Sequence, residues 1–317
     1  MANLRDRDRA QVMLIAAFLL AASFVALALV LNSVIYTENI ATRSEEARGS
    51  EAIFYKSDVV GGAEDIIEYE NRNDTASYAV IEENYRRALR SMNNRTAIQH
   101  SVDGVLARTE LDSVTEGRRI GQFNASDRNF TAHDGSEDWD LATNVQHTRA
   151  FSINVTDSDA LQEESILDFD GSDAPFNITV SDGTDIWAVR IYQDDSVFTD
   201  ATIVDIKGGG ECTADPEPVI DISAGTIDGD DCADLNFGQG VTAPYTVRYE
   251  DAQMMAGNFS LVVESTSVDN SLSRYDSGTD TPFAFPAVYS STLQVTYKST
   301  SLLYETDATV VPGESDA

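Results

Sequence analysis

The feature that most constrains this chain is an apolar run of twenty residues from Val12 to Leu31. The run contains no charged residue, no proline and no glycine, and Ser23 carries its only hydroxyl. At about 1.5 Å per helical residue, its length matches the ~30 Å hydrocarbon core of a bilayer. A helix also satisfies its own backbone hydrogen bonds, as a chain that crosses lipid must do. The sequence therefore predicts a transmembrane helix at residues 12–36, which include the exit from the bilayer.

Charged residues on the two sides of this run indicate its orientation. Arg5, Arg7 and Arg9 precede it, whereas residues 38–48 carry a mixture of acidic and basic side chains. Positive charge favours the cytoplasmic side, and neighbouring acidic residues contribute little to orientation. We therefore expect residues 1–11 in the cytoplasm, a single pass through the cell membrane, and an extracellular C-terminal domain.

The composition is strongly acidic. The chain has 317 residues and a formal net charge of −33, with 54 acidic residues against 21 basic ones. Only Lys56, Lys207 and Lys298 are lysines. Such a surface repels itself in dilute buffer and becomes tolerable when molar salt shortens the screening length to about 3 Å. The composition favours a salt-adapted protein and argues against a nucleic-acid partner, which needs a basic surface.

Acceptor sequences for N-glycosylation recur beyond the apolar run. The chain holds more Asn-x-Ser/Thr triplets than its Asn, Ser and Thr content would give by chance. Glycosylation of at least some of them would fit an extracellular domain. The alternative is that a Thr-rich strand protein collects such triplets by accident. The candidate acceptors are Asn73, Asn94, Asn124, Asn129, Asn154, Asn177 and Asn258.

The residues just before the apolar run, Arg9-Ala10-Gln11-Val12, resemble the class III signal of archaeal type IV pilins and archaellins. That resemblance implies cleavage between Ala10 and Gln11, which would leave the helix as the new N-terminus of a filament subunit. One departure is Ile15, since many pilins carry Glu at this fifth mature position. Together with the acidic, lysine-poor composition, the start of the chain is similar to that of haloarchaeal surface proteins. The partners implied are the lipid bilayer and other copies or subunits of a surface filament.

Residues 37–120 are expected to form a helical stalk. Its clearest part is an apolar stripe with helical spacing, which should pack on another helix or on the next domain. Gly61-Gly62 suggests a helix end or hinge, with a further helix at 63–71. The stripe consists of Tyr78, Ile81, Tyr85, Leu89 and Met92.

From about residue 121 the pattern changes from helical to alternating. Nine short apolar runs, separated by Asp-Gly, Gly-Ser and Pro-bearing turns, predict an antiparallel β-sandwich in residues 121–317. The fold class expected for the whole chain is therefore α+β: transmembrane helix, helical stalk and sandwich ectodomain. The nine predicted strands are 150–156, 176–181, 186–192, 201–206, 219–222, 245–249, 259–264, 293–297 and 302–311.

Cys212 and Cys232 are the only cysteines, and an extracellular location favours a disulfide bond between them over free thiols. Two acidic loops resemble Ca²⁺-binding loops, although neither has Glu at the twelfth position. In so acidic a chain, solvated turns are the favoured interpretation, and no other cofactor is expected. The candidate ligands are Asp168, Asp170, Asp173, Asp228, Asp230 and Asp234.

Motifs of the common enzyme classes are absent from the sequence. It contains no H-E-x-x-H, no G-x-S-x-G and no phosphate-binding loop. We therefore expect no enzyme but a structural or adhesive cell-surface protein of a halophile, with a pilin-like subunit as one form of it. The competing hypothesis is a membrane-anchored extracellular enzyme or solute-binding module.

Overall fold

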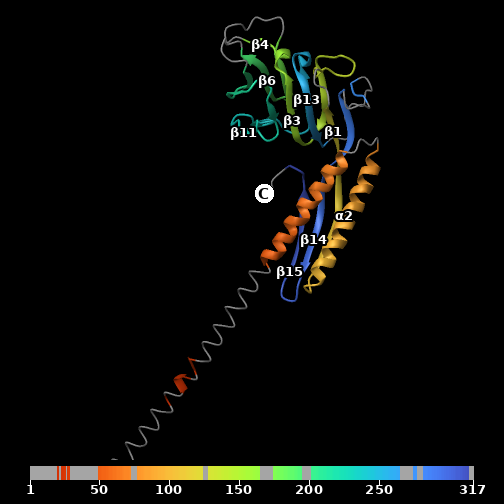
Figure 1. Cartoon of the computed structure of the whole chain (residues 1–317), viewed down its shortest axis with the longest axis vertical. Coiled ribbons are helices and arrows are strands. Elements are labelled where there is room, and N and C mark those ends of the chain that lie inside the picture. Colours follow the sequence, from red (N-terminus) through yellow and green to blue (C-terminus); the bar gives the residue numbers. More distant parts are fainter. Residues whose placement is uncertain are drawn as a thin grey trace, which may run out of the picture.

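The computed structural model describes residues 20, 23–25, 27–28, 49–72, 77–123, 128–164, 174–194, 201–264, 274–276 and 281–313. Two regions are evident (Figure 1): a β-rich head, and below it a lobe in which two helices lie along three strands. The lower lobe contains two helices, one at residues 49–71 and α2 (Tyr78–Ser101). Its three strands are β15 (Leu303–Val310) and the lower halves of β1 (Leu106–Gln122) and β14 (Phe283–Lys298). The upper halves of β1 and β14 belong to the head.

The remaining described elements all lie in the head. They are short strands and two single-turn 3₁₀ helices, η1 (Ser158–Ala160) and η2 (Ala252–Met254). The strands are β2 (Trp139–Val145), β3 (Thr148–Asp157), β4 (Glu163–Glu164), β5 (Phe176–Ser181), β6 (Ile186–Asp194), β7 (Thr202–Ile206), β8 (Glu211–Ala214), β9 (Val219–Asp221), β10 (Thr226–Ile227), β11 (Asp230–Asp231), β12 (Tyr245–Glu250) and β13 (Ala256–Val263).

These strands form two sheets. One has eight strands in the order β11-β10-β9-β3-β13-β1-β14-β15, and the other runs β2-β12-β5-β6-β7-β8, with β4 beside β6. Every pairing is antiparallel except that of β4 with β6. The sheets pack face to face in the head in the manner of a sandwich, as the alternating sequence pattern predicts.

The head has an aromatic core between its two sheets. Alternate residues of β5 are buried, as a strand with one face on a core requires. Phe130 stacks on Tyr249 with 5.6 Å between ring centroids, and Trp139 meets the same tyrosine edge-on at 5.9 Å. The indole nitrogen of Trp139 donates a 2.9 Å hydrogen bond to the carbonyl of Phe130, so this buried polar group has a partner.

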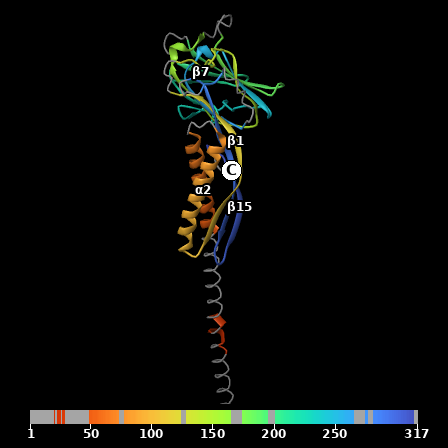
Figure 2. The same cartoon turned by 90° about the vertical axis from the view of Figure 1, so that its right-hand side faces the viewer.

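The lower lobe has a second core, formed between the helices and one face of β1, β14 and β15. The predicted stripe on α2 faces this core: Ile81, Tyr85 and Leu89 are buried. Polar contacts add to the apolar packing, because the Tyr85 hydroxyl lies 2.7 Å from Ser291 Oγ and the Tyr55 hydroxyl 3.0 Å from Thr109 Oγ1. Figure 2 shows both helices on the same side of the strands.

Strands β1 and β14 run through both cores. They pair from Leu106–Lys298 in the lower lobe to Gly121–Phe283 in the head. At about 3.4 Å per residue, the 17 residues of β1 span roughly 55 Å. One hydrogen-bonded ribbon therefore joins the lower lobe to the head.

A register shift interrupts this ribbon where the two cores meet, at Tyr289 of β14. Side chains from two other elements bind the backbone groups there. Asn71, at the end of the 49–71 helix, donates to Val288 O at 2.9 Å and accepts from Val288 N at 2.8 Å. Arg149 of β3 donates to Tyr289 O at 3.2 Å and to Val288 O at 3.3 Å. We call these residues, with Arg119, which donates to Asn71 O, the junction.

The expected arrangement of a transmembrane helix, a separate helical stalk and a distal sandwich is wrong as a fold class. The described chain is mostly β-sheet, and its helices pack on strands that continue into the head. The helical region ends at Ser101 rather than near residue 120, and β1 begins at Leu106. Among the described residues, no helix combines the length and apolar character needed to cross a bilayer. Most of the 12–31 run lies outside those residues.

The predicted break at Gly61-Gly62 is also absent, because the helix is continuous over residues 49–71. A Cβ atom on Gly62 would lie 2.7 Å from Met92 Sδ of α2, whereas one on Gly61 would meet nothing within 4 Å. Gly62 thus allows the two helices to approach closely, and it does not end the first of them.

Replacement of Asn71 by Ala should lower the free energy of unfolding. The change removes two hydrogen bonds: the buried N–H of Val288 loses its side-chain acceptor, and its carbonyl keeps only the bond from Arg149, at a cost of about 2–3 kcal/mol. Asn94→Ala is the control, because this asparagine is exposed on α2, and substitutions at such positions stay within about 0.5 kcal/mol. Urea unfolding of unglycosylated protein measures the free energy of unfolding of both variants. Equal decreases in the two variants would contradict the stabilising role of the junction.

Candidate functional site

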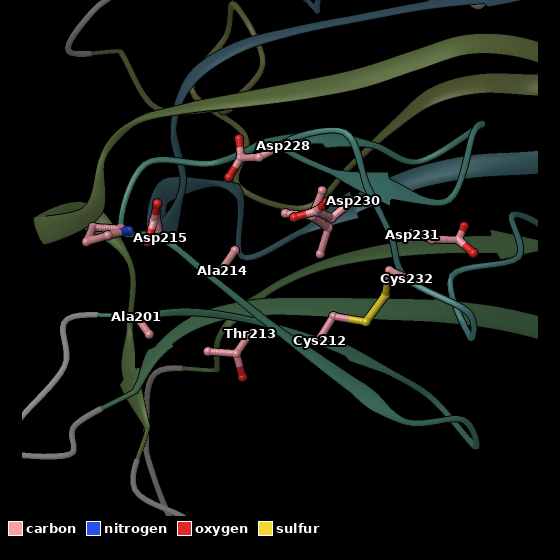
Figure 3. Close-up of a pocket in the computed structure, with 11 residues that line it drawn as sticks. Ala201, Cys212, Thr213, Ala214, Asp215, Asp228, Asp230, Asp231 and Cys232 are labelled. Carbon is pink, nitrogen blue, oxygen red and sulfur yellow. A yellow bond between two sulfur atoms is a disulfide. The ribbon is translucent and has the colours of Figure 1, made fainter.

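Two surface cavities are the candidate binding sites of the described chain. The first lies in the head, beside the disulfide bond, with a volume of about 620 Å³. Figure 3 shows the disulfide between β8 below and the segment following β11 above. The lining is acidic on one side and comprises Ala201, Cys212, Thr213, Ala214, Asp215, Pro216, Ile227, Asp228, Asp230, Asp231 and Cys232.

The predicted disulfide bond between Cys212 and Cys232 is confirmed. Cys212 lies in β8, the last strand of one sheet, and Cys232 directly follows β11, the last strand of the other. The bond therefore fastens the two sheets to each other at one open side of the sandwich. Its position makes it a structural crosslink at the rim of the first cavity.

The predicted Ca²⁺ ligands in this region have structural contacts of their own. Asp228 accepts a 2.8 Å hydrogen bond from Val219 N through its carboxylate. Asp234 does not line the cavity, and its carboxylate oxygen lies 2.5 Å from where a Cβ of Gly210 would be. No group of three or more His, Cys, Asp or Glu within the described ranges is placed to hold a metal ion. Asp168, Asp170 and Asp173 lie outside those ranges, and Ca²⁺ binding stays a prediction.

The second cavity, of about 630 Å³, lies at the free end of the lower lobe. Its wall contains three rings in mutual contact: Tyr55 and Tyr297 lie 5.2 and 5.8 Å from His100, centroid to centroid. Burial raises the pKa of Tyr55 despite the opposing hydrogen bond to Thr109. Tyr297 donates a 3.1 Å hydrogen bond to Glu51 at the cavity rim. The full lining is Glu51, Phe54, Tyr55, Asp58, His100, Asp103, Gly104, Val105, Tyr297, Ser299 and Thr300.

No pattern in the sequence predicts this second cavity. The aromatic residues come from the 49–71 helix, α2 and β14, which are separate elements of the chain. No local sequence pattern predicts that they contact one another. In the sequence, Tyr55 is only one apolar residue in a segment of mixed apolar and charged residues, which does not indicate a binding site. The tertiary contact of the helices with β14 is what creates the site.

The predicted glycosylation sites differ in exposure. Asn94 is exposed, whereas Asn129, Asn154, Asn177 and Asn258 are half-buried. The amide nitrogen of Asn177, which a glycan would modify, donates a 2.7 Å hydrogen bond to Glu250. Asn94 is therefore the most accessible acceptor of the described residues. Asn73 and Asn124 lie outside them, as do Ala10 and Gln11 of the predicted processing site.

Tyr249 has the most strongly perturbed hydroxyl in the head. Complete burial raises its pKa well above the usual value, and its oxygen has no hydrogen-bond partner among the residues that the structure describes. Perturbed groups often mark functional sites, but neither of the two cavities includes Tyr249 in its lining. Its surroundings are the rings of Phe130, Phe176 and Phe259. The hydroxyl is thus an unpaired polar group within an apolar core.

Comparison with known proteins finds a similarity over part of the chain. Residues 6–135 match the sequence model of a family of unknown function, DUF7261. The matched segment contains the apolar run, both helices of the lower lobe and β1, but little of the head. No curated protein and no solved structure matches the chain.

Loss of the disulfide should destabilise the protein. The bond joins residues 20 positions apart, and opening a loop of this size costs about 3 kcal/mol through the larger entropy of the unfolded chain. The double variant Cys212→Ser/Cys232→Ser should therefore unfold at lower urea concentration. Dithiothreitol should reproduce the loss in the wild-type protein and leave the double variant unchanged. A wild-type midpoint that is insensitive to complete reduction would contradict the crosslink's role.

Two Tyr→Phe substitutions should have opposite effects. Tyr249→Phe removes an unpaired buried hydroxyl and should raise the free energy of unfolding by about 1 kcal/mol. Tyr85→Phe removes an equally buried hydroxyl that is bonded to Ser291, and should lower the free energy of unfolding by about 1 kcal/mol. Thermal and urea unfolding of both variants measure the difference. If both substitutions changed the free energy of unfolding in the same direction, the presence of a hydrogen-bond partner would not explain how these hydroxyls affect stability.

Proposed function

We propose that this protein is a structural or adhesive module of the cell surface of a salt-adapted organism, held at a membrane by the apolar run Val12–Leu31. In this proposal the described residues from 49 onward stand outside the cell. The bilayer is the first partner, and further copies of the chain or other filament subunits are the second. The protein performs no reaction of its own.

The observation that carries the proposal is the continuity of β1 and β14 through both cores. A surface module must transmit force between its attachment and its exposed end without unfolding between them. The antiparallel ribbon and the junction contacts of Asn71 and Arg149 link the lower lobe to the head by buried hydrogen bonds. Buried polar groups with partners on both sides of a boundary rigidify it.

The chemistry of the head and of the lower lobe supports an extracellular location. A disulfide between Cys212 and Cys232 persists in oxidising surroundings and is rare in the cytosol. Asn94 offers an exposed acceptor for a glycan. The large negative charge is suited to solvent of high ionic strength, where repulsion between surface carboxylates is screened.

The proposed filament subunit rests on the resemblance of Arg9-Ala10-Gln11 to class III signals. Processing between Ala10 and Gln11 would expose the apolar run at the new N-terminus, from which subunits of that kind assemble. A permanently attached monomer would keep its first ten residues. The two forms differ in the N-terminus of the mature protein.

Protease treatment of intact cells, followed by N-terminal sequencing of the native protein, tests this proposal. We expect head fragments to be released into the medium while cytoplasmic marker proteins stay intact. A mature N-terminus at Gln11 supports the filament subunit, and an uncleaved one supports the attached monomer. Recovery of the whole chain from the cytosol, protected from protease, would disprove the surface role.

A further inference from the structure

Three separate chain segments come together at the free end of the lower lobe, which we call the base. They are the start of the first helix (residues 49–55), the turn after α2 (102–105) and the turn between β14 and β15 (299–302). Both views show these segments at the end opposite the head (Figures 1 and 2). The second cavity takes lining residues from all three, so they form one continuous surface.

Exposed apolar side chains concentrate at the base. From residue 49 onward, ten large hydrophobic side chains of the described chain are exposed, and six of them lie in the three segments of the base or close to them in the chain. Val102 is 83% exposed, Phe54 68% and Leu303 58%. The other three are Ile53, Ile98 and Leu106. Soluble surfaces carry single hydrophobic residues without consequence, but a concentration at one end indicates a contact surface.

The chain enters the described structure at this same end. The described part of the first helix begins at residue 49, at the base, and seventeen residues separate it from Leu31, the last residue of the apolar run. The head lies at the far end of β1, about 55 Å away along the strand. Of the two ends of the molecule, the base is thus the one joined to the membrane-binding run by a short connection.

We propose that the base of the lower lobe rests on the lipid surface, with Phe54, Val102 and Leu303 entering the boundary between headgroups and acyl chains. This inference rests on the proposed attachment through residues 12–31 and adds to it a fixed orientation of the module. The head is then held away from the bilayer by the length of the β1–β14 ribbon.

The charges at the base identify the kind of lipid surface. Lys298 is exposed and pairs in register with both Leu106 and Leu303, so its stem lies between two exposed leucines. A lysine in this setting covers apolar surface and extends its ammonium group toward polar headgroups. Glu51, Asp58 and Asp103 lie at the same end and would be repelled by anionic lipid in dilute buffer. The base therefore suits an uncharged lipid surface, or an anionic one in molar salt.

Lipid contact can be measured with a single fluorescent probe on the full-length chain. Both native cysteines are in the disulfide, so the variant Val102→Cys has one free thiol for a bimane label. The matched control is Ile186→Cys, an exposed β-branched residue in the head. Each labelled chain is reconstituted into phosphatidylcholine vesicles in molar salt, with or without phosphatidylcholine that is spin-labelled near its headgroup.

The inference requires that the spin-labelled lipid quench the probe at position 102 about twofold more than the probe at 186, because protein surfaces bound to bilayers enter them by about 5–10 Å. Equal quenching of the two probes in vesicle-bound protein would overturn the inference and leave the membrane attachment standing. Energy transfer between labelled copies at position 102, without lipid quenching, would overturn it in favour of a second copy on the base. A chain that fails to float with the vesicles would overturn both the attachment and the inference.

Discussion

The pairing of β1 with β14 is the constraint on which the rest of the structure depends. Its hydrogen bonds run from the helix-packed core into the aromatic core of the head. Each core alone would be a small unit with little buried area, since small domains bury a lower fraction of their surface. By sharing two strands, the cores can unfold together.

A long two-stranded ribbon needs a local change of twist to follow both cores, and the junction stabilises the place where that change occurs. A twisted antiparallel pair of this length cannot follow two differently oriented cores without a local change of twist, and bulges provide such changes. The register shift at Tyr289 frees backbone groups from the ladder. Asn71 and Arg149 bind those groups, and Arg149 also lies over the Tyr289 ring at 5.5 Å. The polar residues buried here therefore follow from the strand geometry.

Sequence patterns predicted strands in both the head and the lower lobe but missed β1, β2, β4, β8, β10 and β11. Each of the nine predicted strands overlaps a strand of the structure, because a sandwich strand alternates large apolar and polar residues. β1 was missed because its inward positions near the helices include Ala107 and Thr109, which carry little hydrophobic signal. The helices were found from their stripe, but their partner was not, since a stripe does not specify what covers it. The base cavity likewise depends on contacts between distant segments.

Strand β15 forms an open edge of the larger sheet, and its sequence decides what can be added there. Its exposed positions include Glu305 and Asp307, beside the solvent-facing Thr309. A second β15 pairing with it would bring carboxylates of both copies together, and like charges on neighbouring strands oppose such pairing. Self-association by sheet extension is thereby disfavoured at this edge, most of all in dilute solution. Copies of the chain that gather side by side would have to meet through faces other than the sheet margin.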